Sequence, residues 1–419
     1  IYDACLRLGH FPNHWKLATI VTTPKPGKDL TLTSSYRPIS LLSVPGKVFE
    51  KIINDRLQKI IEDKNIIGLE QMAYRRGKGT PDQLLKLTSD INKSLAKGQF
   101  TSIIMFDVDK AFDRTWNEGL LYKLTQRNFL PNRILRLLHS FLTGRRFQVR
   151  LNNDKSEVRD IDAGTPQGSI LSPTLFILLL ADLPDNIKRH CKVKILQYAD
   201  DLCIYISAKT KRQATTELTK ALRNLEDYAK TWRIGLNPTK SQLLTIKGKR
   251  RQPINLDLTL YGERIPRVQT AKYLGVTYHE SGLFDQHAKA KIEEHNRRIK
   301  HLTGANFKRA ISTKNILTIY KTTIRPILEY AVTGWYANST KRTRKLLTTA
   351  VKTAYTMIFD LPRWTPTHYM ISSTPYEDQD ERMMTLARNH ISKTSIIDDL
   401  HHDRGIQLDH LRIQPIDYF

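Results

Sequence analysis

The sequence predicts an α+β fold in which an antiparallel sheet with its helices precedes a basic helical region. Residues 102–116 form an apolar run that ends in acids, and a second apolar run, 193–206, is interrupted by Asp200 and Asp201. The first run indicates a strand and the second a hairpin, because half-buried strands usually flank a polar turn. Between residues 215 and 232 apolar residues recur at helical spacing. This order is typical of an antiparallel sheet covered by helices on one face.

The length of the chain predicts about two or three folded units. Its 419 residues exceed one domain of roughly 150 residues and leave room for a large core. Hydrophobic residues make up 40% of the chain and charged residues 26%, which is ordinary for a globular protein. We therefore expect the chain to fold, and a pure binding module would not need this length.

The charge balance favours a polyanionic partner. The chain has 67 Lys and Arg against 41 Asp and Glu, a net charge of +26 at pH 7. Basic side chains that neutralise phosphates release counterions, so nucleic acid is the first candidate. An anionic membrane surface is the alternative, but no apolar run approaches the roughly 20 residues that cross a bilayer.

The three cysteines, Cys5, Cys191 and Cys203, are too few and too far apart for a zinc ribbon or a disulfide framework. They are expected to be reduced core residues of an intracellular protein. The chain starts at Ile1 without a methionine and without a signal-peptide pattern, which indicates a piece of a longer polypeptide.

The first hundred residues are expected to mix short strands and helices. Residues 23–38 form a loop dense in Pro, Gly, Ser and Thr, which argues against a long regular element there. Over residues 48–61 the apolar positions fit one face of a helix. The loop carries Lys25, Lys28 and Arg37.

The central region continues the α+β pattern. A helix is expected around residues 120–124, and residues 158–183 predict a Gly/Pro-rich loop followed by a strongly apolar helix. Residues 233–246, RIGLNPTKSQLLTI, are expected to form a turn that leads into a strand. The short basic run 247–253 is expected to be a loop between strands rather than a nuclear localisation signal.

Residues 286–350 predict a basic helical domain. They hold 14 Lys or Arg and 3 Asp or Glu, and their apolar residues recur at helical spacing. An excess this large favours a surface that faces phosphates, and a solvated helix face is the alternative.

Three aspartates are candidates for a metal site. If the strand that ends near Asp107 pairs with the hairpin of Asp200 and Asp201, the carboxylates converge at one edge of the sheet. Carboxylates brought together repel one another unless a cation neutralises them, and Mg²⁺ prefers such oxygen ligands. Two ions about 3.5–4 Å apart can activate an attacking hydroxyl and stabilise a leaving pyrophosphate. The alternative is a solvated turn, where Asp is common.

Six ordered motifs resemble those of reverse transcriptases. One of them, residues 36–57, resembles the fingers motif, and five resemble successive palm motifs. The sequences of residues 74–84 and 319–335 are similar to those of reverse transcriptases of non-LTR retrotransposons, most closely the jockey-like group. The resemblance spans roughly residues 8–370. The palm motifs are FDVDKAFD (106–113), TPQGSILSP (165–173), QYADD (197–201), GLNPTKSQ (235–242) and KYLGV (272–276).

This resemblance implies a right-hand polymerase fold. Residues 1–100 would form the fingers, residues 101–280 the palm with the catalytic motifs, and residues 281–419 a basic helical thumb with a C-terminal extension.

The resemblance also implies the metal ligands. Asp107 and Asp200 would coordinate two Mg²⁺ ions, which Mn²⁺ can replace. Asp201 would be a weaker ligand, and the carbonyl of Val108 would complete one coordination shell. Asp109 and Asp113 share the first motif, but the family does not use them as ligands, and salt links at a helix start are the expected role.

Several residues would contact the incoming nucleotide. Phe112 matches the aromatic residue that blocks a ribose 2′-hydroxyl, although a plain core aromatic is the alternative. Gln167 and Gly168 match the motif that touches the nucleotide and template, where glycine allows close approach of the backbone. A loop glycine at a helix start is the other interpretation. Arg37 matches the arginine that grips the triphosphate, and Lys25 or Lys28 would support it.

The last motifs concern pyrophosphate and the primer. Lys240 matches a lysine proposed to protonate pyrophosphate, and a solvated turn lysine is the alternative. The segment KYLGV resembles the primer grip, a hairpin that positions the primer 3′ end. Its residues are Lys272, Tyr273, Leu274 and Gly275.

The resulting hypothesis is an RNA-directed DNA polymerase of a non-LTR retrotransposon. Its partners would be an RNA template, a DNA primer or RNA–DNA hybrid, and dNTPs, and it would work inside the cell, in the nucleus at the site of integration. Two alternatives stay open. One is an RNA-dependent RNA polymerase, although Phe112 and the sequence YADD argue against it. The other is a catalytically silent nucleic-acid-binding relative.

Overall fold

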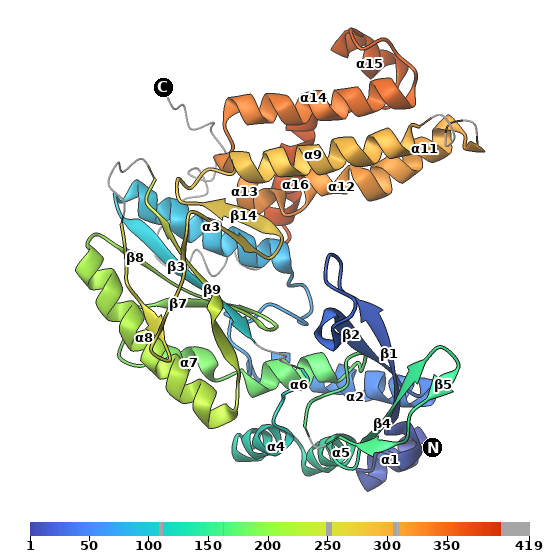
Figure 1. Cartoon of the computed structure of the whole chain (residues 1–419), viewed down its shortest axis with the longest axis vertical. Helices are drawn as coiled ribbons and strands as arrows, with labels where there is room; N and C mark the ends of the chain where they lie inside the picture. Colours follow the sequence, from blue (N-terminus) through green and yellow to red (C-terminus); the bar gives the residue numbers. More distant parts are fainter. Residues whose placement is uncertain (109–111, 162, 249–253, 305–307, 309, 395–419) are drawn as a thin grey trace.

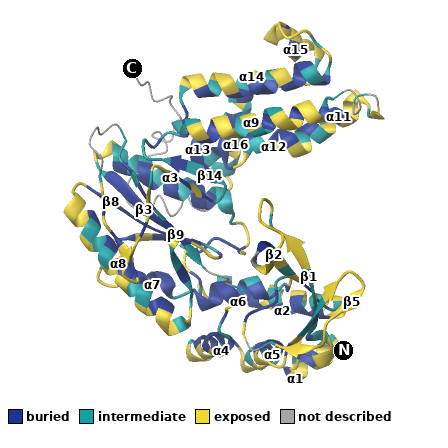
Figure 2. Ribbon diagram, in the orientation of Figure 1, coloured by how far each residue is buried: buried dark blue, intermediate teal, exposed yellow. Residues whose placement is uncertain are grey.

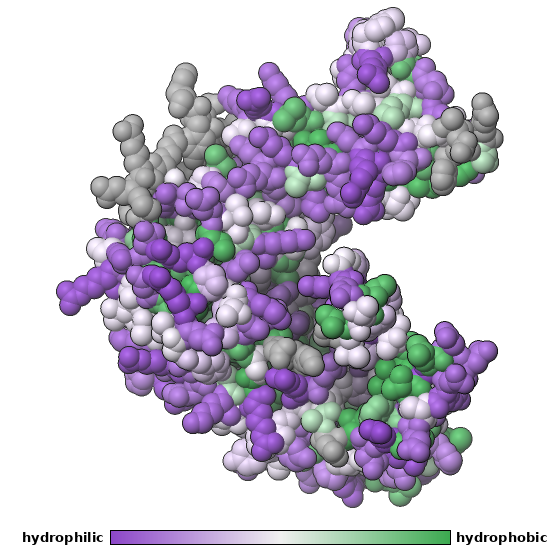
Figure 3. All heavy atoms as spheres, in the orientation of Figure 1, coloured by the Kyte–Doolittle hydropathy of each residue, from purple (hydrophilic) through white to green (hydrophobic). Residues whose placement is uncertain are grey.

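The computed structural model describes residues 1–108, 112–161, 163–248, 254–304, 308 and 310–394. In Figure 1 the chain has the outline of a letter C. A lobe of strands and helices from the first half of the chain and a helical lobe from the last third lie on either side of an opening, and a central sheet joins them. The space-filling view in Figure 3 shows a deep notch between the two lobes.

The central sheet has five strands in the order β12-β9-β3-β8-β7. All neighbouring strands are antiparallel except β12 and β9. The predicted α+β class and the predicted hairpin are therefore confirmed. The strands are β3 (Phe100–Val108), β7 (Lys194–Tyr198), β8 (Asp201–Ala208), β9 (Leu236–Ile246) and β12 (Arg267–Val268).

Helices cover both faces of this sheet. Ile104 of β3 lies in a core cluster with α8 (Lys211–Trp232), whereas Ile103 lies in a second cluster with α3 (Thr80–Ala96). The prediction that only one face is covered is wrong. The reason is visible in β3, where every residue from 100 to 106 is buried, as expected for a continuous apolar strand rather than an alternating one. In Figure 2 β3 is dark blue over most of its length.

The first lobe contains a second sheet, in the order β2-β1-β4-β5 with β6 also paired to β4. The strand β4 pairs in parallel with β1, so residues 146–151 join a sheet that residues 17–24 begin. The predicted boundary at residue 100 therefore does not follow the sheet. The strands are β1 (Leu17–Pro24), β2 (Tyr36–Leu41), β4 (Arg146–Leu151), β5 (Asp154–Lys155) and β6 (Arg159–Asp160).

Helices pack under this second sheet around a third core cluster. The helix expected over residues 48–61 is α2, which begins four residues earlier. The strongly apolar helix expected after the Gly/Pro-rich loop is α6, and the helix expected near residue 120 is α4. The helices are α1 (Tyr2–Leu8), α2 (Val44–Asp63), α4 (Asn117–Gln126), α5 (Asn132–Leu142) and α6 (Ser172–Leu179). The short helix α7 (Leu183–Lys188) instead packs with α8 in the cluster of the central sheet.

The described part of the chain after residue 284 is helical, as predicted. It follows two short hairpins, β10 (Thr259–Leu260) with β11 (Glu263–Arg264), and β13 (Thr270–Tyr273) with β14 (Val276–His279). A π-helical turn, η3 (Tyr320–Ile324), separates α11 from α12. The α-helices are α9 (Asp285–Leu302), α11 (Thr313–Ile319), α12 (Pro326–Glu329), α13 (Val332–Trp335), α14 (Lys341–Ile358), α15 (Thr367–Ser373) and α16 (Gln379–Ile391).

The helical lobe is joined to the central sheet by α3. The Thr88 hydroxyl of α3 donates to the carbonyl of Gly334 in α13 at 2.7 Å, and the buried residues of both belong to one cluster. None of the helices in the described ranges is long and apolar enough to span a membrane. Most of the expected basic loop, residues 249–253, lies outside the described residues.

Candidate active site

Three carboxylates meet at one end of the central sheet. Asp107 lies at the end of β3, Asp200 lies in the turn of the β7–β8 hairpin, and Asp201 is the first residue of β8. The strands β3 and β8 are antiparallel neighbours with Phe106 opposite Leu202, so Asp107 is next to Asp201. The sheet register thus brings together two motifs that lie far apart in the sequence.

The electrostatic environment of the hairpin carboxylates favours a bound cation. Loss of hydration, then the charge of Asp200 and then that of Asp107 raise the pKa of Asp201 to about 6. The pKa of Asp200 is also raised, mainly by loss of hydration and further by Asp107. Both side chains remain open to solvent at the turn, so a cation can reach them. A bound cation would neutralise these charges and remove the repulsive part of the pKa shifts, which adds to the larger effect of lost hydration.

Lys240 is the cation beside Asp107 in this structure. Its Nζ lies 3.4 Å from Asp107 Oδ2. The predicted turn NPTK lies inside β9, where the register against β3 shifts between Met105 and Asp107. The Asn237 side chain accepts hydrogen bonds from the Lys240 amide at 3.1 Å and from the Thr239 hydroxyl at 2.9 Å. This local loop is what points Lys240 at the carboxylates.

The donor chemistry of the site fits divalent metal ions. Asp107, Asp200 and Asp201 supply the hard oxygen ligands that Mg²⁺ prefers. Across the described part of the chain, no group of three or more His, Cys, Asp or Glu side chains is arranged to enclose an ion. The three carboxylates are grouped at one end of the sheet without converging on a single point. Asp109 lies outside the described residues, and Asp113 is exposed on the following loop.

Phe112 packs against α6. Its ring centroid is 5.0 Å from that of Phe176, which is buried. The loop after β3 is held by two hydrogen bonds, from the Thr165 amide to the Phe112 carbonyl at 2.8 Å and from the Gly164 amide to the Thr115 carbonyl at 2.9 Å. A partly buried ring with fixed backbone is suited to a steric role.

The segment with Gln167 and Gly168 is joined to β2. The Ser40 amide donates to the Gln167 carbonyl at 2.8 Å. Gly168 has φ +114°, and a Cβ added there would lie 2.8 Å from the Ser40 carbonyl oxygen. Glycine is thus required for the close approach of two backbones within the protein, beside any approach to a ligand.

Glu50 supports the same segment and has no counterpart among the predicted site residues. Its carboxylate is 1% exposed and accepts hydrogen bonds from the Ser169 hydroxyl at 2.5 Å and from the Ile170 amide at 2.7 Å. It belongs to α2 and lies at the start of α6, where a negative charge is favourable. The sequence signal was an acid on the apolar face of a helix, beside Phe49 and Ile53.

Arg37, Lys25 and Lys28 share the β1–β2 hairpin. Arg37 and Lys28 are exposed and Lys25 is half-buried. The Lys25 amide donates to the Ser35 carbonyl at 2.8 Å, which closes the hairpin below its loop. In Figure 1 this hairpin projects toward the opening between the two lobes.

The hairpin β13–β14 carries the predicted primer-grip residues. Its turn residues, Leu274 and Gly275, both have positive φ, as in a tight type I′ connection. Lys272 is exposed, whereas Tyr273 is buried and its hydroxyl accepts from Gln83 Nε2 at 3.0 Å. Of the predicted set, Tyr273 is therefore a packing residue.

Tyr330, which is not among the predicted site residues, fixes the tip of this hairpin. Its hydroxyl lies 2.9 Å from the Leu274 carbonyl and 2.8 Å from Thr80 Oγ1. A Cβ on Gly275 would lie 3.1 Å from the Tyr330 ring. The hairpin is thereby tied to both α3 and the helical lobe.

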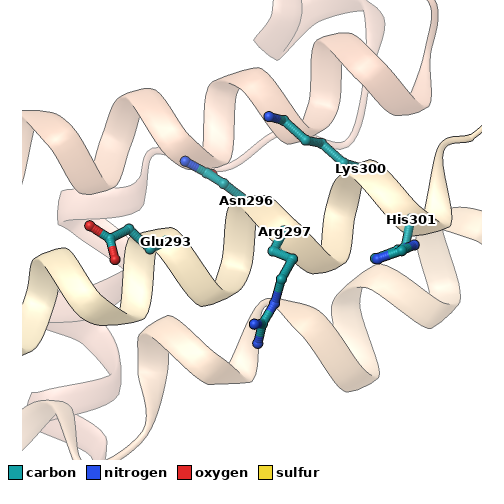
Figure 4. Close-up of a pocket in the computed structure, with 5 residues that line it drawn as sticks. All are labelled: Glu293, Asn296, Arg297, Lys300 and His301. Atoms are coloured by element: carbon teal, nitrogen blue, oxygen red, sulfur yellow. The ribbon is translucent and has the colours of Figure 1, made fainter.

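A shallow hollow of about 450 Å³ lies on the helical lobe, along α9. Figure 4 shows that Arg297 and His301 point to one side of the helix and Asn296 and Lys300 to the other. Glu293 is the acid at one end. The hollow is mixed in charge and open, which suits a surface for a polar partner better than a pocket for a small molecule.

Comparisons with known proteins point to one family. Residues 23–278 match the model of the family described as reverse transcriptase (RNA-dependent DNA polymerase). The chain is 33% identical over 340 residues to the probable RNA-directed DNA polymerase from transposon BS of Drosophila melanogaster, and the aligned region covers 80% of this chain and 37% of that protein. It is 32% identical over 337 residues to the RNA-directed DNA polymerase from mobile element jockey of Drosophila funebris, and that alignment covers 79% of this chain and 36% of that protein.

Among solved structures, apo telomerase from Candida tropicalis is similar, with a TM-score of 0.49 and 11% identity over 92% of this chain and 63% of that chain. The predicted resemblance to the jockey-like group is confirmed by the sequence relatives. The chain spans about a third of the length of the curated relatives it matches.

Proposed function

The chain belongs to the reverse transcriptase (RNA-dependent DNA polymerase) family, and from this membership we propose that it copies an RNA template into DNA. The reaction would add dNTPs to the 3′-hydroxyl of a primer. The observation that carries the proposal is the meeting of Asp107, Asp200 and Asp201 at one edge of the central sheet, within the matched region.

Asp107 and Asp200 would hold two Mg²⁺ ions, with Asp201 as a weaker ligand and the Val108 carbonyl on one of them, and Mn²⁺ could replace Mg²⁺. When bound, such ions polarise the attacking hydroxyl and neutralise the departing pyrophosphate. Asp201 must lose its proton to contribute, because a carboxyl with a pKa of about 6 is partly neutral in mild acid. Lys240 would move from Asp107 to the pyrophosphate, where it supplies positive charge or a proton.

The remaining residues would position the nucleotide. Phe112, which packs on Phe176, would lie under the sugar and exclude a 2′-hydroxyl. Gln167 and Gly168 would contact the nucleotide and the template. Arg37 would bind the triphosphate with its planar guanidinium, helped by Lys25 or Lys28. Catalysis of this kind depends on positioning and on neutralising charge rather than on a covalent nucleophile.

We assign the first lobe to the fingers, the central sheet to the palm and the helices after residue 284 to a basic thumb. The pairing of β4 with β1 supports counting residues 146–160 with β1 and β2 in the fingers, whereas α3 packs on the central sheet. The template–primer hybrid would lie in the notch of Figure 3, with the primer 3′ end near Lys272, Leu274 and Gly275. The nucleus, where a DNA copy would meet its target, is the proposed place of action.

Two other functions make different predictions for one assay. The whole chain is given a primed RNA template with dNTPs or with rNTPs in Mg²⁺, and hybrid binding is measured in parallel. The proposal expects extension with dNTPs and little with rNTPs. Efficient extension with rNTPs would instead favour an RNA-dependent RNA polymerase. Salt-sensitive hybrid binding without any extension would favour a catalytically silent nucleic-acid-binding protein.

A further inference from the structure

A segment between α2 and α3 lines the open edge of the catalytic hairpin. The Gln197 amide of β7 donates to the Glu70 carbonyl at 2.8 Å, and the Met72 amide donates to the Gln197 carbonyl at 3.2 Å. Gln71 thereby forms a parallel bridge with Gln197. The hairpin that carries Asp200 is thus supported on one side by β3 and on the other by this segment.

The side chain of Gln71 reaches the tip of the hairpin. Its Oε1 accepts hydrogen bonds from the Ala199 amide at 3.1 Å and from the Ala73 amide at 3.0 Å. Gln71 is 2% exposed, so water cannot easily take over these bonds. One oxygen therefore joins the residue before Asp200 to the segment that lines the hairpin.

The turn that receives this bond is under backbone strain. Ala199 has φ +56°, a left-handed conformation that is unfavourable for residues other than glycine. Such a conformation persists only where surrounding contacts determine it. The Gln71 carboxamide is a contact of this kind, because it binds the Ala199 amide directly.

Gln71 is itself held in place by a buried arginine. The Arg75 guanidinium donates to the Gln71 carbonyl at 3.2 Å and to the Gly68 carbonyl at 2.8 Å. The same group makes two bonds to the Glu62 carboxylate, at 2.8 and 2.7 Å. The segment is thus anchored to the end of α2 rather than free to follow the turn.

We infer that Gln71 is a positioning residue of the active site, whose carboxamide sets the Ala199 turn and so directs the Asp200 carboxylate toward its metal ion. The inference rests on the proposed function, since it treats Asp200 as a ligand. Groups that orient a metal ligand from behind commonly change metal affinity or activity by about 10- to 100-fold when removed.

The test compares two buried glutamines, one beside the catalytic hairpin and one on α16. Gln71→Met keeps the volume of the side chain and removes the acceptor for both amides. Gln379→Met is the matched control, because Gln379 is 0% exposed, its Oε1 accepts a hydrogen bond from Arg325 at 3.4 Å, and it lies outside every motif of the candidate site. Three measurements are made on the whole chain: Mn²⁺ affinity by electron paramagnetic resonance without hybrid or dNTP, hybrid Kd by filter binding, and steady-state extension of a primed RNA, which gives kcat and the KM for dNTP.

We expect Gln71→Met to weaken Mn²⁺ binding and to lower kcat by about 10- to 100-fold, with hybrid Kd and dNTP KM within about twofold of the native values. Gln379→Met should stay close to native in all four quantities. Unchanged Mn²⁺ binding in Gln71→Met, or equal losses in both variants, would overturn the inference. If Gln71→Met does not fold, Gln71→Asn, which keeps the amide but is one methylene shorter, decides by the same readouts.

Failure of the proposed function gives a different result. In that case the native chain itself extends no primer, whereas the Mn²⁺ comparison between Gln71→Met and Gln379→Met still reports on the turn.

Discussion

Asp201 shows how the fold makes a carboxylate sensitive to pH. Its pKa rises from the usual 3.8 to about 6, because of lost hydration and the neighbouring Asp200 and Asp107. The folded state therefore holds this proton more tightly than the unfolded state. Between pH 4 and pH 6 the contribution of Asp201 to stability falls as pH rises, and it is constant above that range.

Replacing Asp201 with Asn should therefore stabilise the metal-free protein more at pH 7 than at pH 4. The expected difference in the Tm gain is on the order of 2 °C, because solvent screens an exposed carboxylate. The measurement is thermal unfolding of native and variant protein in a chelator at both values of pH. A Tm difference that does not change with pH would contradict the raised pKa.

Phe112 should set the choice of sugar. Shortening it in Phe112→Ala removes the ring above Phe176 and should raise kcat/KM for an rNTP relative to the matching dNTP by roughly 10- to 200-fold. Single-nucleotide addition with paired dNTP and rNTP substrates measures this ratio. Phe112→Tyr keeps the ring and is the control, which should retain native discrimination. A native ratio in Phe112→Ala would assign the ring to packing alone.

The residues proposed to have direct chemical roles carry stronger sequence signals than those that support them. Asp107, Asp200 and Asp201 are indicated by acids that interrupt apolar strands. Glu50 acts through a buried contact with residues 169–170, about 120 positions away. It lies within the segment 36–57 and on an apolar helix face, but neither feature indicates which residues it contacts. Gln71 carries no such sequence signal, because a single polar residue in a loop does not stand out from any regular pattern of apolar residues.

At the scale of elements, the loop before α6 depends on its contact with β2. Gly168→Ala would bring a Cβ to 2.8 Å from the Ser40 carbonyl oxygen at φ +114°, so the loop must move and carry Gln167 with it. We expect kcat/KM for dNTPs to fall by at least about tenfold, because small misplacements of positioning groups are costly. Steady-state extension kinetics measure this change.

Gly262→Ala is the matched control for that loop. Gly262 also has positive φ, +80°, but nothing lies within 4 Å of an added Cβ, so it tests strain without the collision. Equal losses of kcat/KM in the two variants would show that the contact with β2 is not what matters.

Elements with local signals were predicted well, and pairing between distant elements was not. Helical spacing predicted α2 and α8 to within a few residues. The joining of β4 to β1 depends on contacts across more than a hundred residues, which no local pattern encodes. The covering of both faces of the central sheet could have been predicted, because the run FTSIIMF in β3 does not alternate.

At the scale of the whole molecule, the net charge of +26 predicts strongly salt-dependent binding of a hybrid. Each phosphate that the protein neutralises adds about 0.9 to the slope of log K against log salt for a B-form duplex. The surface of the hollow along α9, which includes Arg297 and Lys300, carries part of this charge. Lys300→Ala on that surface should lower the slope by about 1 and weaken binding similarly for all sequences.

Lys51→Ala is the control for the α9 variant. Lys51 is an exposed lysine on α2 that pairs with Asp55 on the same helix. Its removal should leave the slope unchanged. Filter binding of an RNA–DNA hybrid across a range of salt concentrations gives both slopes, and equal slopes for Lys300→Ala and the native chain would remove α9 from the hybrid path.

The most direct test of the central claim is primer extension by Asp200→Asn on an RNA template with dNTPs and Mg²⁺, under single-turnover conditions beside the native chain. We expect the native chain to extend the primer and the variant to bind the hybrid with native affinity but to add nucleotides about a hundred- to a thousandfold more slowly, as when a transition-state contact is lost. Extension by Asp200→Asn at the native rate would contradict the assignment of the three carboxylates as the site of DNA synthesis.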